Sequence, residues 1–307
     1  MSFDVLQDKI REKKNPTVAG LDARVEYVPP HILKKYTDQY GETLQAAALA
    51  VKEFDCGLID ALCDVVPAVK PQSAYFEMLG WQGMQVMEEV ISYAQSKGMF
   101  VIADIKRGDI GTTATAYSEA WLGTTKVGNS NCSVFNADCV TLNGYMGSDS
   151  LNPFLDSCKE LDKCAFALVK TSNPSSSELQ DIVAGDRVVY TVMGDLIERL
   201  AKDTVGKYGY TALGVVVGAT HPSELKTLRR RLEKSFFLVP GYGAQGGTAE
   251  DVQHAFDHYG HGAIINASRS IMCAWKKTGK DGLDYQEAAR AAAIQMRDEI
   301  AEYVTIV

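Results

Sequence analysis

The sequence lacks any uninterrupted apolar run of the ~18 residues that a membrane-spanning helix requires. Its first residues, MSFDVLQDKIREKK, mix charged and apolar side chains and contain no apolar core of a secretory signal. None of the seven cysteines belongs to a C-x-x-C motif, and an odd number cannot all pair, which is typical of reduced thiols. We therefore expect a soluble, cytoplasmic protein that does not bind membranes.

Positive charge is also in short supply. Lysine and arginine number 31 against 39 aspartates and glutamates, so the net charge is −8. This balance argues against a broad surface for nucleic acid, although it allows a local basic pocket for one phosphate. The turn after the first apolar run has no G-x-G-x-x-G motif, so a dinucleotide site has no support.

What the sequence does contain is a series of short, β-branched apolar runs separated by amphipathic stretches of helical period. The eight runs span residues 17–21, 65–69, 100–105, 139–142, 165–169, 213–217, 236–239 and 263–265. The helical stretches include residues 44–65, 75–96, 113–121, 223–232 and 248–256. Near-continuous apolar strands that alternate with helices indicate a parallel sheet covered by helices.

Eight such units predict an α/β fold of the (β/α)8 TIM-barrel type, with residues 1–307 forming a single domain. A doubly wound sheet is the alternative, but polar side chains follow nearly every run, as expected where a barrel gathers its chemistry. We expect an insertion around 173–212 that could act as a lid, and a C-terminal helix around 284–305. No linker or repeat divides the chain.

The segment ADIKRGDIGTT carries the sharpest chemical signal. Asp104 and Lys106 lie two residues apart on a predicted strand, so their side chains share one face. Asp109 follows, and Lys70 ends another predicted strand. Charges placed together at strand ends cost desolvation energy unless they are paired, so the four residues suggest an alternating network. A purely structural ion pair is the alternative reading of this spacing.

Asp104, Lys106 and Asp109 form a D-x-K-x-x-D pattern. The chain around them resembles the orotidine 5′-monophosphate decarboxylase family, specifically its bacterial subgroup with longer chains. The resemblance covers residues 20–271. Seven segments occur in the family's order: GLDAR, VKPQSAYFE, DIKRGDIGTTA, LVKTSNP, VVVGAT, LVPGYGAQGG and INASRSI. D-x-K-x-x-D alone would be weak evidence, because related sugar-phosphate barrels also carry it.

The resemblance implies roles for the charged residues. Lys106 matches the lysine that protonates the pyrimidine C6 as CO2 leaves, and Asp104 matches the carboxylate beside the substrate carboxylate. Lys70 matches the lysine that holds the network and reaches the ribose. Asp22 matches the aspartate that binds the ribose hydroxyls. The reaction implied converts orotidine 5′-monophosphate into uridine 5′-monophosphate without a metal or other cofactor.

The resemblance also implies a homodimer with shared active sites. Asp109 and Thr113 match residues that one subunit contributes to the site of the other. Ser172 matches the serine that hydrogen-bonds the pyrimidine ring. Asn143 is kept after the fourth strand, but Gly144 stands where the family has a proline, so we expect a change in loop rigidity.

The glycine-rich segment PGYGAQGG predicts a phosphate site. Gly243 and Gly246 let backbone N–H groups approach an anion, and the following helix begins near Thr248. Arg269, after the last strand, can hold phosphate oxygens bidentately. By the resemblance, Gln245 bridges the phosphate and the lid.

Parts of the sequence are also compatible with two other functions and one other site. A related barrel could decarboxylate a sugar phosphate through a magnesium-stabilised enediolate, and a degenerate barrel could simply bind nucleotides. His254, His258 and His261 cluster, but no acidic or thiol ligand stands in register with them, so a solvated helix face is favoured over a metal site.

Overall fold

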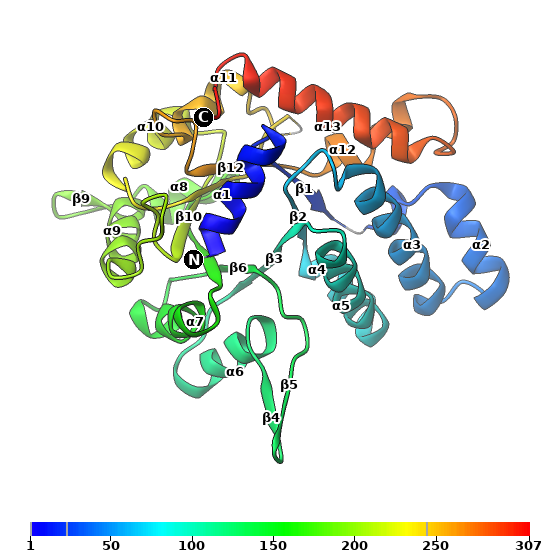
Figure 1. The fold of residues 1–307 in the computed structure, drawn as a ribbon, viewed down its shortest axis with the longest axis horizontal. Coiled ribbons are helices and arrows are strands. Elements are labelled where there is room, and N and C mark those ends of the chain that lie inside the picture. The colour runs from blue at the N-terminus through cyan, green and yellow to red at the C-terminus, as the bar shows by residue number, and fades with distance from the viewer. Residues whose placement is uncertain (1, 23, 244) are drawn as a thin grey trace.

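The computed structural model describes residues 2–22, 24–243 and 245–307, and its centre is a closed barrel of parallel strands (Figure 1). The strand order around the barrel is β1-β12-β11-β10-β7-β6-β3-β2. The strands are β1 (Thr17–Leu21), β2 (Ala68–Pro71), β3 (Phe100–Arg107), β6 (Cys139–Leu142), β7 (Cys164–Lys170), β10 (Leu213–Val217), β11 (Phe237–Val239) and β12 (Ala263–Ala267). The predicted single-domain (β/α)8 barrel is therefore confirmed.

Helices form the outer layer of the barrel. The longer ones are α2 (Pro30–Tyr40), α3 (Leu44–Leu62), α5 (Gly80–Ser96), α6 (Gly111–Trp121), α7 (Ser148–Leu161), α9 (Val189–Ala201), α10 (Pro222–Arg231) and α13 (Tyr285–Ala301). Short helical segments are α4 (Ser73–Glu77), α8 (Ser177–Gln180), α11 (Ala249–Val252), α12 (Arg269–Met272), and the 3-10 turns η1 (Val25–Tyr27), η2 (Pro174–Ser176), η3 (Gln253–Ala255) and η4 (Ala274–Lys277).

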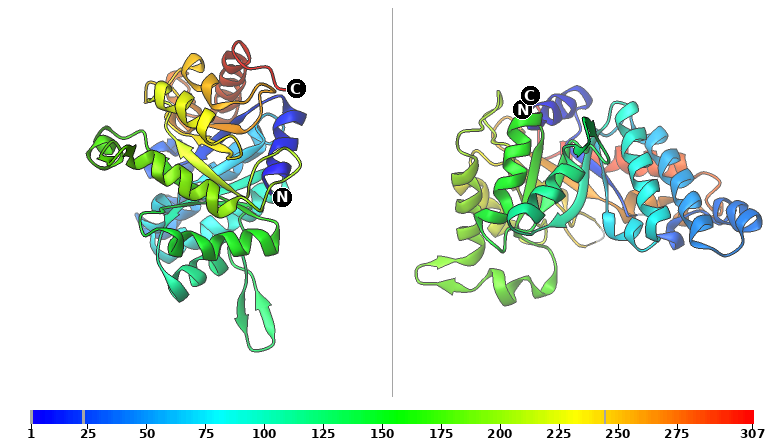
Figure 2. Two further views of the ribbon diagram at one scale, coloured as in Figure 1. Left: turned by 90° about the vertical axis from the view of Figure 1, so that its left-hand side faces the viewer. Right: turned by 90° about the horizontal axis from the view of Figure 1, so that it is seen from below.

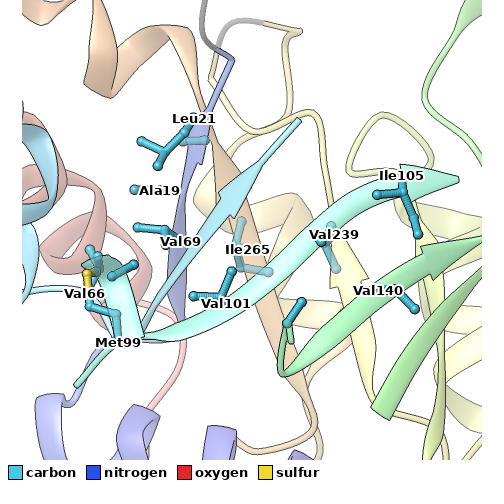
Figure 3. Close-up of a cluster of buried hydrophobic side chains, with 14 of the residues drawn as sticks. Ala19, Leu21, Val66, Val69, Met99, Val101, Ile105, Val140, Val239 and Ile265 are labelled. Atoms are coloured by element: carbon cyan, nitrogen blue, oxygen red, sulfur yellow. The ribbon is translucent and has the colours of Figure 1, made fainter. Parts of the chain in front are cut away.

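Apolar side chains fill two layers, one inside the barrel and one between the strands and the helices. Alternate strand residues such as Phe166 and Ile264 point into the barrel, where α1 (Ser2–Lys13) adds Phe3 and Leu6. Helix α1 therefore covers one end of the barrel, as its position across the strands in Figure 1 shows. The outer layer includes Val69, Val101 and Ile265, which face the helices (Figure 3).

The region 173–212 contains η2, α8, a hairpin of β8 (Val183–Ala184) and β9 (Arg187–Val188), and α9. A second hairpin, β4 (Thr125–Val127) with β5 (Ser130–Cys132), projects away from the barrel (Figures 1 and 2). The C-terminus lies against the last turn of α1, since Arg11 Nε donates to Val307 O at 2.8 Å. Among the described residues, every helix is too short or too polar to cross a lipid bilayer.

Candidate active site

A cavity of ≈490 Å³ lies beyond the carboxyl ends of the barrel strands. Six of the residues predicted from the sequence line it together: Asp22, Lys70, Asp104, Lys106, Ser172 and Gln245. They come from elements β1, β2, β3 and the segments after β7 and β11. Parallel strands carry their carboxyl ends to one rim of a barrel, which is why residues so far apart in the chain meet here.

Asp104 is the centre of the charged group in this cavity. Its two carboxylate oxygens lie 2.6 Å from Lys70 Nζ and 2.6 Å from Lys106 Nζ. Lys70 is buried, whereas the side chain of Lys106 is 46% exposed and faces the cavity. One carboxylate therefore holds two ammonium groups in fixed positions at the cavity, and the ammonium of Lys106 is the more exposed of the two.

Two neutral side chains that the sequence prediction missed complete the hydrogen bonding of Asp104. Gln72 Nε2 donates to one carboxylate oxygen at 2.9 Å, and the Thr141 hydroxyl donates to the other at 2.8 Å. Thr141 is the third residue of β6, and Gln72 lies two residues after Lys70. The period of two along a strand is the signal that pairs Gln72 with Lys70 on one face.

The ion pairs set the charge of this group. Burial opposes ionisation of Asp104, but the attraction of Lys70 and Lys106 outweighs it and holds the pKa of the carboxyl well below its ordinary value. Burial likewise opposes the charge of Lys70, yet the nearby Asp104 and Asp22 carboxylates raise the pKa of its ammonium. The site thus carries a carboxylate and fixed positive charge at neutral pH.

The backbone of β3 changes at its carboxyl end in a way that directs Lys106. The pairing between β3 and β6 shifts register between Ala103 and Arg107. Lys106 takes a φ of 45°, which is rare for a residue with a side chain. Its N–H donates to Thr141 Oγ1 at 3.0 Å, which helps hold this strained conformation.

Beside this charged group, β1 and β12 approach each other closely. A Cβ on Gly20 would lie 2.0 Å from Ser268 Oγ, so a larger residue at that point of β1 would displace the Ser268 side chain. Asn266 and Ser268 line the cavity next to Asp22, and Asn266 Oδ1 is buried without a hydrogen-bond partner in the part of the chain that the structure describes. Polar groups are thus available on the wall nearest Asp22.

The glycine-rich segment forms a tight turn after β11. Gly243 and Gly246 have φ values of 67° and 99°, which glycine adopts without strain. Gln245 and Gly241 line the cavity, while Gly243 and Gly246 lie on the outer side of the turn. Arg269 is the first residue of α12 and is exposed.

Six predicted residues do not line the cavity of the single chain: Gly243, Gly246 and Arg269, described above, and Asp109, Thr113 and Asn143. Asp109 accepts a hydrogen bond from the N–H of Ile110 and does not contact Asp104, and Thr113 is exposed in the first turn of α6. Asn143 is exposed after β6, where its side chain accepts from Tyr145 N. A Cβ on the neighbouring Gly144 would lie 3.0 Å from Met193 Sδ, so glycine there allows α9 a close approach.

For His254, His258 and His261, the sequence favours a solvated helix face over a metal site. His261 is buried, and its Nε2 lies 2.8 Å from Val307 O. Across residues 2–22, 24–243 and 245–307, histidine, cysteine and acidic side chains form no group of three or more suited to a metal ion.

The chain matches a family model described as "Orotidine 5′-phosphate decarboxylase / HUMPS family" over residues 45–279. It is 42% identical to an orotidine 5′-phosphate decarboxylase of Rhodopirellula baltica, over 92% of this chain and 93% of the relative. It is 39% identical to one of Clostridium perfringens, over 99% of both chains.

Solved structures give the same picture. A putative orotidine-monophosphate decarboxylase of Toxoplasma gondii superimposes with a TM-score of 0.77 and 28% identity, covering 98% of both chains. The orotidine monophosphate decarboxylase of Leishmania donovani superimposes with a TM-score of 0.71 and 30% identity, also covering 98% of both.

Proposed function

Because this chain belongs to the orotidine 5′-phosphate decarboxylase family, we propose that it converts orotidine 5′-monophosphate into uridine 5′-monophosphate and CO2, the last step of pyrimidine nucleotide synthesis. The observation that carries the proposal is the buried Asp104 held between the ammonium groups of Lys70 and Lys106 at the cavity wall. Membership of the longer-chain subgroup and a cytoplasmic location stay predictions from the sequence.

Lys106 is the proton donor in this proposal. The bond between C6 and the carboxylate breaks, CO2 leaves, and the electron pair stays on C6. The Lys106 ammonium gives its proton to C6, and solvent later returns a proton to the amine. A fixed ammonium lowers the energy of the developing carbanion because it needs no reorganisation during the reaction. Asp104 holds that amine in position through their ion pair.

The remaining cavity residues orient the substrate. Asp22 and Lys70 bind the ribose hydroxyls, and Ser172 hydrogen-bonds the pyrimidine ring. At the other end, Gln245 and the turn containing Gly243 and Gly246 receive the phosphate. Arg269 joins them as a bidentate partner. Support comes from the common cavity of Asp22, Lys70, Ser172 and Gln245.

The same cavity becomes complete in a homodimer. Exposed apolar residues follow three strands that are neighbours in the barrel, β2, β3 and β6. They are Met78, Trp81, Ile110, Tyr145 and Met146. Apolar side chains gathered on one rim are typical of a contact surface. Asp109 and Thr113 lie beside Ile110 in the chain, so a partner seated there receives them at its own site.

Loss of orotidine 5′-monophosphate absorbance in excess EDTA tests the reaction. We expect turnover that EDTA does not reduce, and a loss of at least about a thousandfold in kcat for Lys106→Ala. Lys34→Ala, which removes an exposed lysine paired with Asp38, is the control and should retain full activity. Turnover of a sugar phosphate that needs magnesium, or nucleotide binding with no turnover, would support the rival functions instead.

Mixed dimers test the shared site. Lys106→Ala and Asp109→Ala chains, each inactive alone, should recover about a quarter of wild-type activity on mixing, because half the dimers are hybrids with one intact site. A mixture of Lys106→Ala with Asp104→Ala should stay inactive, since both changes affect the residues that one chain supplies. Absence of recovery in confirmed hybrid dimers would rule out the shared site.

A further inference from the structure

Strand β7 ends in a buried amine that the proposed reaction does not use. Lys170, the last residue of β7, has a side chain that is 0% exposed. It lies two residues before Ser172, yet it does not line the cavity. Burying an ammonium is costly unless a charged partner compensates it. The partner of Lys170 therefore shows which part of the chain this amine holds in place.

The partners of Lys170 all lie in the segment that follows it. Its Nζ is 2.6 Å from Asp181 Oδ1 and 3.3 Å from Ser176 Oγ. It also lies 5.8 Å from the centre of the ring of Tyr190, the second residue of α9. The amine therefore gathers three points of the chain from residues 176 to 190 around the end of one strand.

A second fastening closes the same segment. Gln180 accepts a hydrogen bond from Thr171 N at 2.9 Å and donates to Thr171 Oγ1 at 2.7 Å. Thr171, Ser172, Asn173 and Gln180 all line the cavity. Asp181 follows Gln180 directly, so the ion pair to Lys170 places Gln180 at the cavity as well.

We infer that Lys170 is a positioning residue: through Asp181 it holds residues 171–182 in the form that receives the pyrimidine end of the substrate. This inference rests on the proposed function for the identity of the substrate. Without the ion pair, only a fraction of molecules has the segment in place, and the apparent affinity falls by that fraction. Chemistry at Lys106 proceeds unchanged once substrate is bound, so KM rises while kcat is kept.

The ion pair is tested with Lys170→Met, Asp181→Asn and Asp181→Glu. The first two should raise KM for orotidine 5′-monophosphate by about tenfold or more with kcat within about threefold of wild type. Asp181→Glu keeps the charge and should restore KM to within about threefold. The Lys170→Met, Asp181→Asn double variant should be no worse than the poorer single variant, because both remove the same interaction. Asp64→Asn, which breaks an exposed pair with Arg290 of α13, is the control and should leave KM unchanged.

Amide hydrogen exchange of peptides covering residues 174–188 gives a readout independent of activity. These amides should exchange faster in Lys170→Met and Asp181→Asn than in wild type, with the barrel strands unaffected. If Lys170→Met fails to fold, the contrast between Asp181→Asn and Asp181→Glu decides. Unchanged KM and unchanged exchange in Asp181→Asn would overturn the inference. A wild-type protein that does not turn over the substrate would refute the proposed function, and the exchange experiment would still decide the ion pair.

Discussion

Two buried aspartates near the cavity show how the same residue type can take opposite protonation states. Asp104 receives hydrogen bonds from Lys70, Lys106, Gln72 and Thr141, and its pKa is lowered despite its burial. Asp55, on α3, is fully buried, and neither of its oxygens has a hydrogen-bond partner among the described residues. Burial, with the charge of Asp22, raises the pKa of Asp55 well above its ordinary value.

Asp55→Asn should therefore stabilise the protein at neutral pH. Above about pH 4 the unfolded chain loses the Asp55 proton while the folded chain keeps it, so folding takes up a proton and wild-type stability falls as pH rises. Asparagine cannot ionise, which removes this fall. We expect a gain of about 1 kcal/mol or more at pH 7 that disappears near pH 4.

Thermal and urea unfolding between pH 4 and 8 measure this difference. Asp60→Asn on the same helix is the matched control. Burial raises the pKa of Asp60, but the hydrogen bonds from Lys97 and Tyr93 outweigh this effect and lower it. Its stabilising effect is present above the ordinary pKa and is lost as pH falls, so Asp60→Asn should lower stability slightly at pH 7. If Asp55→Asn behaves like Asp60→Asn, the Asp55 carboxyl is not a buried neutral acid.

At the scale of elements, the apolar runs predicted both ends of β1, β6 and β10, but not those of β2. The run 65–69 begins before β2, because Val66 N still bonds to Leu62 O in the turn that ends α3. The predicted helix 75–96 is divided into α4 and α5 at Gly80, whose φ is 69°. Both differences arise from turn geometry, which hydrophobic periodicity does not predict.

The chemistry of the residues predicted the charged part of the site, whereas the neutral Ser172 and Gln245 were predicted from the family resemblance. Lys70, Asp104 and Lys106 were found because charges at strand ends require an explanation. Gln72 and Thr141 were missed, since their contact with Asp104 depends on which strands are neighbours in the barrel. The Lys170 contacts were missed because Asp181 lies in a segment without hydrophobic period.

The glycine-rich turn depends on an element distant in the chain. Tyr242 donates a hydrogen bond to Glu299 of α13, which ties the turn to that helix. Tyr242→Phe should leave the ring packed but free the turn, raising KM about fivefold, the equivalent of one hydrogen bond, with kcat nearly unchanged. Steady-state kinetics measure this effect. Tyr93→Phe is the control, because it removes a tyrosine hydroxyl that donates to Asp60. Equal KM values in the two variants would show that the turn does not depend on its hydrogen bond to α13.

At the scale of the whole molecule, five of the exposed apolar residues follow neighbouring strands, where the proposed partner sits. Trp81 is 72% exposed and belongs to the rim formed after β2, β3 and β6. Leu283 is 74% exposed but lies just before α13, away from that rim. The two residues have nearly equal exposure and differ in location, so they form a matched pair.

Trp81→Glu should convert the dimer into monomers and reduce activity in proportion, because a charge in an apolar contact is desolvated without a partner. Leu283→Glu should leave both mass and activity unchanged. Sedimentation velocity and kinetics over a range of protein concentrations measure the two properties together. Dimers of undiminished stability in Trp81→Glu would place the contact surface elsewhere.

The pairing of β1 with β12 joins residues 17–19 to residues 265–267, so the barrel closes only through the last strand of the chain. A nascent chain on the ribosome holds β1 early and β12 last, and until β12 emerges both flanking strands have open edges that can pair with other chains. Asp22 and Asn266, on opposite sides of this seam, meet only at that moment. No translation intermediate therefore has a complete cavity, and a premature stop before β12 abolishes both the fold and the site in one step.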